Sequence, residues 1–480
     1  MLNLVPTPKK CNICNEKFST VNIGIYTDNP QWQSYIKPFC DAFYTINNVT
    51  LSDEKGGIEL YKDDSLKKAS YVIKSDGAIR LYASDDEGIL YALSSVMQLV
   101  RIEKGNVTVQ KFEIEDYPEK EYRAFMVDMG RLWHPFDKLL KFVDICFLYK
   151  IKYLHLHFID TGVYSLPSKA FPKLPTEGEH YTFEQIEYLN QYAKDKGIIL
   201  VPEYECPGHA PQFNRAYPEI FSDTIEGAQD GIYYNELGEV IKSNNIICAG
   251  SEKAWEATKL LLKEICDMFP DSPYINIGGD EAKISVWNDC SVCREYMKKH
   301  NLADEYELYS EYVARVTSYV LTLGKIPLVW EGFPKKGSEK IPKETIVIAW
   351  ESYYHMPKDL LNAGFKVINA SWQPLYIVPK VDLRWDTFDI LKWDVYNWQH
   401  WWNKSDAYLN PIHLEPTDNV LGAMLCAWEQ TYEQEIQFVT ENLSAMSEKL
   451  WSVKRVCSDE EFVKKQAPLI YLAALIIRDR

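Results

Sequence analysis

The chain has 480 residues, which predicts two or three domains and a large buried core, and its formal net charge is −17. A field of that sign repels phosphate backbones, so the composition argues against a nucleic acid as partner. No apolar run approaches membrane-spanning length, and residues 1–18 lack the apolar core of a signal peptide. The sequence therefore favours a cytoplasmic protein that has no membrane partner.

Residues 1–118 are predicted to form a small α+β domain. Short runs at residues 21–27, 69–75 and 78–84 read as strands because they are rich in apolar and β-branched residues. Residues 88–102 have the longer apolar pattern of a helix. Strands combined with one helix in a short segment are typical of an α+β domain.

Eleven cysteines, an odd number in a long chain, do not indicate a dense disulfide framework. Two pairs have C-x-x-C spacing, Cys11 with Cys14 and Cys290 with Cys293, and together they could form one zinc site. The pairs fall in different predicted domains and no additional histidine accompanies them. Ordinary reduced thiols are therefore the favoured interpretation, and we expect neither a metal ion nor a cofactor.

From Arg123 onward, apolar strands alternate with amphipathic helices. Counting the apolar runs gives eight strands, which lie near residues 125, 151, 198, 274, 326, 345, 365 and 420. Eight parallel strands with intervening helices predict a (β/α)8 TIM barrel. The predicted fold is thus α/β, with a barrel and C-terminal helices over residues 119–480 that follow the small α+β domain.

In such a barrel the reactive groups collect at the C-terminal ends of the strands. The residues at those ends are acids and tryptophans: Asp128, Asp160, Glu203, Glu205, Asp280, Glu281, Trp330, Glu331, Trp350, Glu351, Trp372, Trp428 and Glu429. Carboxylates supply acid and base, and indole faces provide walls for the C–H surface of a sugar ring. A single tryptophan is as readily a core residue, but four at separate strand ends favour a sugar site.

The stretch "YINIGGDEA", residues 274–282, ends a predicted strand with adjacent acids, Asp280 and Glu281. A conventional glycosidase places its two carboxyl groups about 5 to 9 Å apart across the scissile bond, usually from different strands. Adjacent residues cannot easily straddle a sugar in this way. One of them is therefore expected to protonate the leaving oxygen, while the other steers a nucleophile that the substrate carries, such as a 2-acetamido oxygen.

Four segments, "YRAFMVDMGR", "LHLHFID", "VPEYECPGHA" and "INIGGDEA", resemble motifs of the family 20 glycoside hydrolases, the β-N-acetylhexosaminidases. The resemblance spans nearly the whole chain. It implies a retaining exo-β-N-acetylhexosaminidase that acts on a glycan or glycoconjugate. Such an enzyme releases terminal β-linked N-acetylglucosamine or N-acetylgalactosamine by substrate-assisted catalysis, through an oxazolinium intermediate.

The resemblance also implies roles for individual residues. Asp280 matches the carboxylate that orients and charge-stabilises the acetamido group, and Glu281 matches the general acid and base. His209 and Asp160 match the pair that positions this acid, and Tyr376 the tyrosine that binds the acetamido oxygen. The predicted substrate-binding residues are Arg123, Trp330, Trp350, Trp372, Trp428 and Glu429.

Several positions depart from the family pattern. Ala124 stands where glycine is common, Thr161 where many members have a second Asp, and Val378 where an Asp or Asn often follows the tyrosine. Glu429 lies in "WEQ" instead of Trp-Gly-Glu. The preference for glucosamine or galactosamine stays open. Arg123 opens its strand, although the barrel rule favours Asp128 or Arg131 at the opposite end.

Two alternatives remain. His155 and His157 lie on one face of a strand and, with Asp160 and His209, could form the site of a metal-dependent barrel hydrolase. Core histidines are the more frequent outcome of such a pattern. The other alternative is a carbohydrate-binding protein with an inactive site, against which the intact set of acids, His209 and Tyr376 argues.

Overall fold

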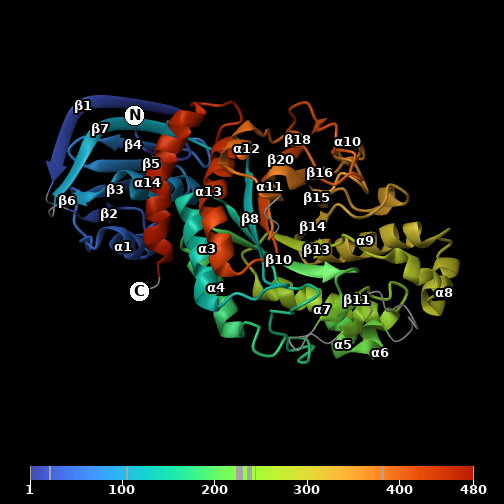
Figure 1. Cartoon of the computed structure of the whole chain (residues 1–480). Helices are drawn as coiled ribbons and strands as arrows, with labels where there is room; N and C mark the ends of the chain where they lie inside the picture. Colours follow the sequence, from blue (N-terminus) through green and yellow to red (C-terminus); the bar gives the residue numbers. More distant parts are fainter. Residues whose placement is uncertain are drawn as a thin grey trace.

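The computed structural model of the chain describes residues 2–478, except for residues 21–22, 104–105, 223–230, 235–239, 244 and 380–382. Figure 1 shows a small domain beside a larger barrel, with both chain ends at the side of the small domain, the N-terminus near its top and the C-terminus near its bottom. The first two residues of the predicted strand at 21–27 fall outside the described ranges. Within those ranges, no helix is long and apolar enough to cross a membrane.

The N-terminal domain is a mostly antiparallel sheet with helices on one face. Its strands follow the order β1-β7-β4-β5-β3-β2, and β6 pairs with β7. Helix α2 packs on β4 and β5 and, on its other side, against barrel helix α3 (Phe136–Leu148). The elements are β1 (Lys10–Thr20), β2 (Ile25–Thr27), α1 (Gln33–Asn47), β3 (Ile58–Lys62), β4 (Tyr71–Ser75), β5 (Ile79–Ala83), α2 (Asp86–Leu99), β6 (Ile102–Glu103) and β7 (Asn106–Asp116).

The predicted eight-stranded parallel barrel is confirmed. Each strand pairs in parallel with the next, and the sheet closes because the eighth strand pairs with both the seventh and the first. The barrel strands are β8 (Tyr122–Asp128), β9 (Tyr153–His157), β10 (Ile199–Cys206), β13 (Tyr274–Gly278), β14 (Ile326–Trp330), β15 (Ile346–Ala349), β16 (Lys366–Asn369) and β20 (Val420–Ala427). A short strand, β17 (Tyr376–Ile377), adds to the C-terminal end of β20.

Helices surround the barrel, and several begin with side-chain caps that the sequence supplies. Thr431 and Gln434 form a capping box at the start of α13, and Ser251 caps α7. The helices are α4 (Phe183–Lys194), α5 (Pro211–Ala216), α6 (Pro218–Phe221), α7 (Glu252–Met268), α8 (Ser291–Lys299), α9 (Glu305–Thr322), α10 (Pro357–Asn362), α11 (Trp372–Leu375), α12 (Thr387–Lys392), α13 (Tyr432–Trp451) and α14 (Asp459–Ile477).

Alternation along the strands separates two apolar layers. In β8, Tyr122, Ala124 and Met126 face the barrel interior, whereas Phe125 and Val127 join the layer between barrel and helices. Every residue of β8 is buried, as expected for a parallel strand covered on both sides. The interior layer forms the floor beneath the C-terminal strand ends.

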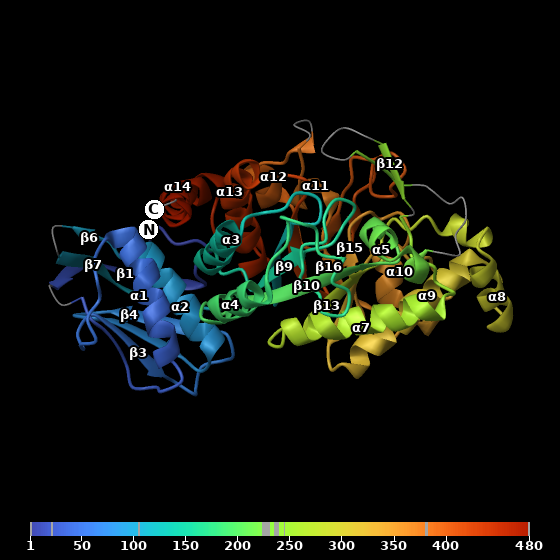
Figure 2. The same cartoon turned by 90° about the horizontal axis from the view of Figure 1, so that it is seen from below.

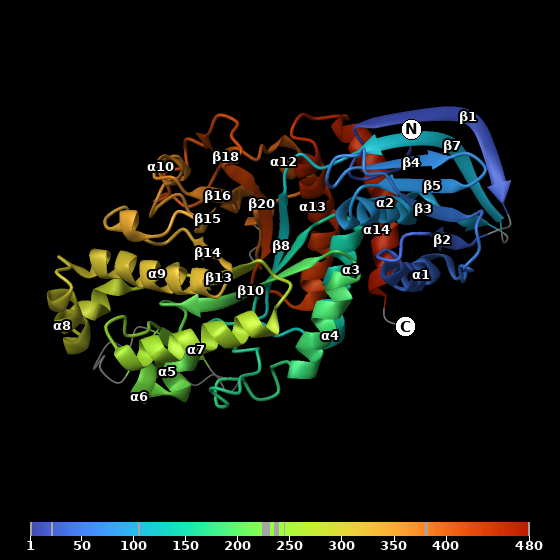
Figure 3. The same ribbon diagram turned by 180° about the vertical axis from the view of Figure 1, so that it is seen from behind.

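The C-terminal helices hold the N-terminal domain against the barrel. Figures 1 and 3 show α14 lying along the small domain, and it packs against α1 and α3. Trp451 at the end of α13 donates its indole N–H to Asp116 of β7 at 2.8 Å. Tyr71 donates to the same carboxylate at 2.6 Å, and the Nζ of Lys150 lies 3.8 Å away. Both domains therefore share one buried polar centre.

Candidate active site

A pocket of about 490 Å³ opens at the C-terminal ends of the barrel strands, a size typical of small-molecule sites. Seven of the eleven residues that were predicted to be catalytic or substrate-binding line this pocket, including both adjacent acids. The lining residues are Arg131, Asp280, Glu281, Trp350, Glu351, Trp372, Tyr376, Val378, Pro379, Leu383, His400, Trp401, Trp402, Trp428 and Glu429.

The two glycines before the acids turn the chain where no side chain fits. Gly278 and Gly279 have φ of +70° and +91°, and a Cβ on Gly278 would lie 1.9 Å from Oε1 of Glu205. After this turn the two carboxyl groups stay near each other, with an oxygen of each within 4.8 Å of the other, but they differ in exposure. The side chain of Asp280 is 13 % exposed and that of Glu281 is 52 % exposed. One acid is therefore held inside the pocket while the other stands at its mouth.

His209 connects the two acids to a deeply buried carboxylate. Its Nδ1 lies 3.2 Å from Oδ1 of Asp160, which is completely buried. Its Nε2 lies 3.4 Å from Oε2 of Glu281 and 3.9 Å from Oδ2 of Asp280. The imidazole is thus placed between Asp160 and the pair of acids.

The charges of this cluster give the acids different proton affinities. Burial would lower the pKa of His209, but Asp160 and the two acids raise it well above its usual value. His209 in turn lowers the pKa of Glu281. Burial raises the pKa of Asp280 to about 6, although the positive charge of His209 opposes this shift. The two neighbouring carboxyl groups therefore respond to pH over different ranges.

Arg131 closes the other side of the cluster. It lies 2.9 Å from Asp160 and 3.2 Å from Asp128, and its guanidinium sits 4.8 Å from the ring centre of Trp428. Burial would raise the pKa of Asp160, but Arg131 and His209 hold it well below its usual value. Glu429 is exposed, and its Oε1 lies 3.6 Å from Arg131 Nε. Asp160 therefore lies between Arg131 and His209, and both favour its charged form.

Beneath this layer, Glu203 collects hydrogen bonds from the inner face of the barrel. Trp330 Nε1 donates to its Oε1 at 2.6 Å, and His155 and His157 approach its Oε2 at 2.9 and 2.7 Å. The second nitrogen of His157 bonds to Asp160 at 2.8 Å. Both nitrogens of His157 are thus engaged by carboxylates, and His155 and His157 are joined through Glu203 in one hydrogen-bonded network.

Glu331 supports the wall of the pocket. Its carboxylate accepts the backbone N–H groups of residues 352 to 355, at 2.8 to 3.3 Å. The indole of Trp350 donates to the Glu331 carbonyl at 2.8 Å. Next to this segment, burial and the nearby Glu281 raise the pKa of Glu351 to about 8. Glu331 therefore fixes the loop that presents Trp350 and Glu351.

Aromatic rings form the apolar part of the pocket. Tyr376 stacks between Trp350 and Trp372, at centroid distances of 6.0 and 4.7 Å. Trp428 lies 6.0 Å from Tyr376 and completes the enclosure. These rings come from β15, from α11 with β17, and from the end of β20. The site therefore has a carboxylate side and an aromatic side.

Two predicted sugar-binding residues lie elsewhere. Arg123 starts β8 and points outward, away from the pocket. Its completely buried guanidinium donates to backbone carbonyls of residues 120, 121 and 150, and it lies over Tyr91 and Trp451 at about 5 Å. Trp330 is 1 % exposed and lies beneath the pocket, bonded to Glu203. Arg131, which the barrel rule favoured, is the arginine that lines the pocket.

Other lining residues escaped the sequence analysis. His400, Trp401 and Trp402 come from the long segment between β16 and β20, and Trp401 is 38 % exposed. None of them lies at the end of a barrel strand, so the rule that reactive groups collect at strand ends does not identify them. The signal available was compositional, because the run "NWQHWWN" over residues 397–403 is unusually aromatic.

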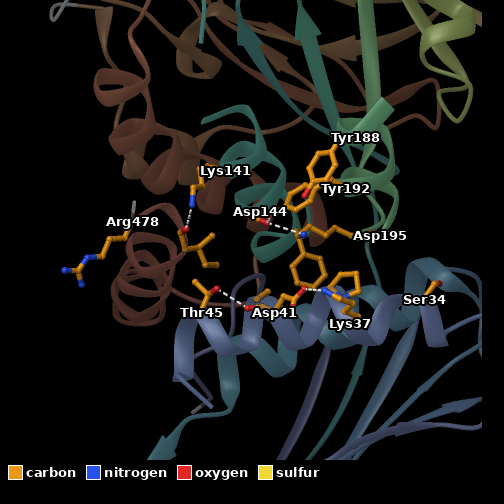
Figure 4. Close-up of a pocket in the computed structure, with 15 residues that line it drawn as sticks. Ser34, Lys37, Asp41, Thr45, Lys141, Asp144, Tyr188, Tyr192, Asp195 and Arg478 are labelled. Carbon is orange, nitrogen blue, oxygen red and sulfur yellow. Dashed lines mark hydrogen bonds and ion pairs between the residues drawn. The ribbon is translucent and has the colours of Figure 1, made fainter. Parts of the chain in front are cut away.

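A second cavity, of about 460 Å³, lies far from the acids, between α1 of the small domain and the barrel helices (Figure 4). Four of its charged groups form two ion pairs. Lys37 bonds to Asp41 at 2.8 Å, and Lys196 lies 3.5 Å from Asp144. Tyr192 also donates to Asp144, at 2.8 Å. The cavity is a gap in the domain interface and offers no reactive pair.

A parallel barrel with carboxylates and stacked indoles at the C-terminal strand ends is a kind of site that glycoside hydrolases use. Comparison with known families agrees. Residues 121–454 match the catalytic domain of glycosyl hydrolase family 20, and residues 1–117 match domain 2 of the same family. The chain therefore belongs to glycosyl hydrolase family 20.

Curated relatives share about a quarter to a third of their aligned residues with this chain. A beta-hexosaminidase of Porphyromonas gingivalis is 28 % identical over 378 residues, which cover 73 % of this chain and 47 % of the relative. A beta-hexosaminidase subunit beta of Entamoeba histolytica is 26 % identical over 402 residues, covering 80 % of this chain and 68 % of the relative. The chain thus spans roughly half to two thirds of the length of these relatives.

Solved structures share the fold. The exo beta-N-acetylglucosaminidase of Vibrio harveyi superposes with a TM-score of 0.83 at 21 % identity, covering 99 % of this chain and 77 % of that one. The beta-N-acetylhexosaminidase of Bacteroides fragilis gives a TM-score of 0.78 at 24 % identity, covering 96 % and 93 %. At these identities the likeness establishes the two-domain architecture.

Proposed function

We propose that the protein is a retaining exo-β-N-acetylhexosaminidase, which releases terminal β-linked N-acetylglucosamine or N-acetylgalactosamine from a glycan or glycoconjugate. The observation that carries this proposal is the contrast between the two adjacent acids. Asp280 faces the aromatic pocket, whereas Glu281 stands at its mouth beside His209. A sugar seated against the indoles places its C2 substituent and its leaving oxygen near different acids.

In this proposal the acetamido oxygen of the substrate attacks C1 and closes an oxazolinium ring, while the glycosidic bond breaks. Asp280 stabilises the positive charge that develops on the acetamido nitrogen. Tyr376, whose ring is stacked between two indoles, hydrogen-bonds the acetamido oxygen and aligns it. Water then attacks C1 from the side that the leaving group vacated. The C1–oxygen bond of the oxazolinium ring breaks, which restores the acetamido group, and the anomeric configuration is retained.

Glu281 supplies the proton for the leaving oxygen. In the free site the positive charge of His209 favours the Glu281 carboxylate. A glycosidic oxygen packed against this half-exposed side chain removes its water, and loss of water favours the protonated form. After departure of the leaving group, the same carboxylate accepts a proton from the attacking water. Asp160 holds His209 in place throughout.

Names of similar proteins support the proposal. The relatives from P. gingivalis and E. histolytica are both called beta-hexosaminidases. Structures of family members from Vibrio harveyi and Streptomyces plicatus were solved in complex with N-acetylglucosamine.

Turnover of paired aryl β-glycosides tests the proposal. We expect hydrolysis of an aryl N-acetyl-β-glucosaminide and, because neither acid is placed for direct attack, at least about 100-fold slower hydrolysis of the matching 2-hydroxy glucoside. NMR of the first product should show the β-anomer. Comparable rates on both substrates would contradict the proposal, and binding without any turnover would identify a carbohydrate-binding protein.

A further inference from the structure

Three cysteines form a buried cluster, two of them in the segment that follows Glu281. Cys248 Sγ lies 3.6 Å from the Sγ atoms of both Cys290 and Cys293. All three side chains are buried, and their sulfur atoms lie within 4.8 Å of one another. The C-x-x-C pair of Cys290 and Cys293 is thus joined by a third thiol, that of Cys248, from another loop.

This cluster differs from the zinc site considered from the sequence. Cys11 and Cys14 lie on β1 of the small domain, whereas Cys290 and Cys293 lie at the start of α8. Figures 1 and 3 place β1 and α8 at opposite ends of the molecule. The two C-x-x-C pairs therefore do not form one site, and Cys248 takes the place of the distant pair.

We propose that Cys248, Cys290 and Cys293 bind one soft divalent cation, zinc, through their thiolates. Zinc–sulfur bonds of about 2.3 Å in a tetrahedron set the sulfur atoms about 3.8 Å apart, close to the spacings found here. A disulfide needs about 2.05 Å between sulfurs. Among the described residues, the group consists of these three cysteines, which would supply three of the four ligands of a tetrahedral ion.

The backbone around the cluster suits thiolates. Cys290 is the N-cap of α8, and its Sγ accepts the backbone N–H of Cys293 at 3.4 Å. The helix N-terminus contributes partial positive charge at the same place. Arg315 donates to the carbonyl of Ala249, next to Cys248, at 3.4 Å and adds a full charge nearby. These groups offset the net negative charge of three thiolates around one divalent ion.

The proposed ion joins the two loops that carry His209 and Glu281. Cys248 follows the segment that starts at the end of β10, where Ile247 N–H bonds to the Pro207 carbonyl at 2.9 Å. Cys290 follows Glu281, and Trp287 between them donates to the Ile247 carbonyl at 3.0 Å. A metal bridge would therefore fix the relative positions of the two loops that make the His209–Glu281 contact.

Metal analysis of the purified full chain tests this proposal. We expect about one zinc per chain after gel filtration, and less than about a fifth of that in Cys248→Ser and Cys293→Ser. Cys146→Ser is the matched control, because Cys146 is also completely buried but lies in α3 outside the cluster. It should keep its zinc even if it is less stable. Replacement of zinc by cobalt should produce thiolate-to-cobalt charge-transfer absorption.

A readout on the unsubstituted protein keeps the test valid if the variants do not fold. A strong chelator should lower the melting temperature of the unsubstituted chain and should leave that of a folded Cys248→Ser variant unchanged. The proposal would be overturned if native protein from zinc-supplemented medium contained no metal and also bound no cobalt when cobalt was added. So would a disulfide between two of Cys248, Cys290 and Cys293, identified by peptide mapping of the denatured, unreduced chain.

Discussion

Asp280 and Glu281 are neighbours in the chain, yet their side chains meet different surroundings. Asp280 lies in the pocket and Glu281 is half-exposed beside His209. In the proposed mechanism Asp280 stabilises charge on the acetamido group whatever the leaving group, while Glu281 protonates the leaving oxygen. Because the two acids have different roles, replacing each of them should reduce activity in a different way.

Asp280→Asn should slow activated and unactivated substrates alike, by on the order of 100-fold or more, because ring closure always needs its charge. Glu281→Gln should slow substrates with poor leaving groups far more than an activated aryl glycoside, whose departure needs little protonation. The measurement is kcat/KM for each variant over a series of leaving groups. An identical leaving-group dependence in both variants would mean that the two acids do not divide the work.

Acid pH should remove activity through Asp280. Its pKa of about 6 means that the carboxylate is charged above that pH and becomes neutral as the pH falls through it. A neutral Asp280 cannot stabilise the acetamido charge, so kcat/KM should fall below about pH 6. The pH profile of the wild type shows this limb, and that of Asp280→Asn should lack it. Retention of the limb in the variant would assign it to another group.

At the scale of single elements, the loop after β15 depends on one buried carboxylate. Glu331→Gln replaces an acceptor of four backbone N–H groups by an amide with one oxygen. We expect the free energy of unfolding to fall by about 2 kcal/mol, and KM to rise more than kcat falls because the loop presents Trp350. Denaturant unfolding and steady-state kinetics measure both.

The exposed Glu344, which precedes β15, provides the control. Glu344→Gln should change neither the free energy of unfolding nor KM. If Glu331→Gln behaved in the same way, the loop would have to be held by other contacts.

The sequence predicted the elements better than it predicted the directions of side chains. The apolar runs identified all eight barrel strands, because buried parallel strands need continuous apolar residues. The acids of "GGDEA" were recognisable because two glycines directly precede them at the end of an apolar run, a pattern that indicates a tight turn. Arg123 was wrongly predicted to bind the sugar, because a family motif identifies a residue but not the face of the strand from which its side chain points. Alternation along β8 turns it outward, at the opposite end of the barrel from the pocket.

The loop residues of the pocket could not be predicted in the same way. Trp401 and Trp402 reach the site because the segment between β16 and β20 folds over the strand ends. That path depends on contacts far apart in the chain. Asn369, for example, donates to the carbonyls of Val395 and Asn397 at 2.9 and 2.8 Å. Only the aromatic composition of the segment was visible in the sequence.

At the scale of the whole molecule, the position of Arg123 predicts a role in joining the domains. Its guanidinium lies against both Tyr91 of the small domain and Trp451 of α13, with no exposed surface. Arg123→Lys should lower the free energy of unfolding by about 3 kcal/mol, because a lysine cannot satisfy the same carbonyls. KM for an aryl N-acetyl-glucosaminide should stay within about twofold of the wild type.

Arg294→Lys serves as the control, since Arg294 is exposed and lies on α8. Arg294→Lys should alter neither the free energy of unfolding nor KM. A rise of tenfold or more in KM for Arg123→Lys at unchanged stability would return Arg123 to the substrate site.

The central claim is that the substrate supplies the nucleophile through its acetamido oxygen. Its most direct test is kcat/KM for aryl β-glucosaminides whose N-acetyl group carries zero, one, two or three fluorine atoms. Fluorine withdraws electrons from the amide oxygen without changing the leaving group or the two acids. We predict a steep fall in rate with each fluorine, to less than about a hundredth of the parent rate for the trifluoroacetamide. Rates that do not change along the series would contradict attack by the acetamido oxygen and would require another nucleophile, either an enzyme carboxylate or water.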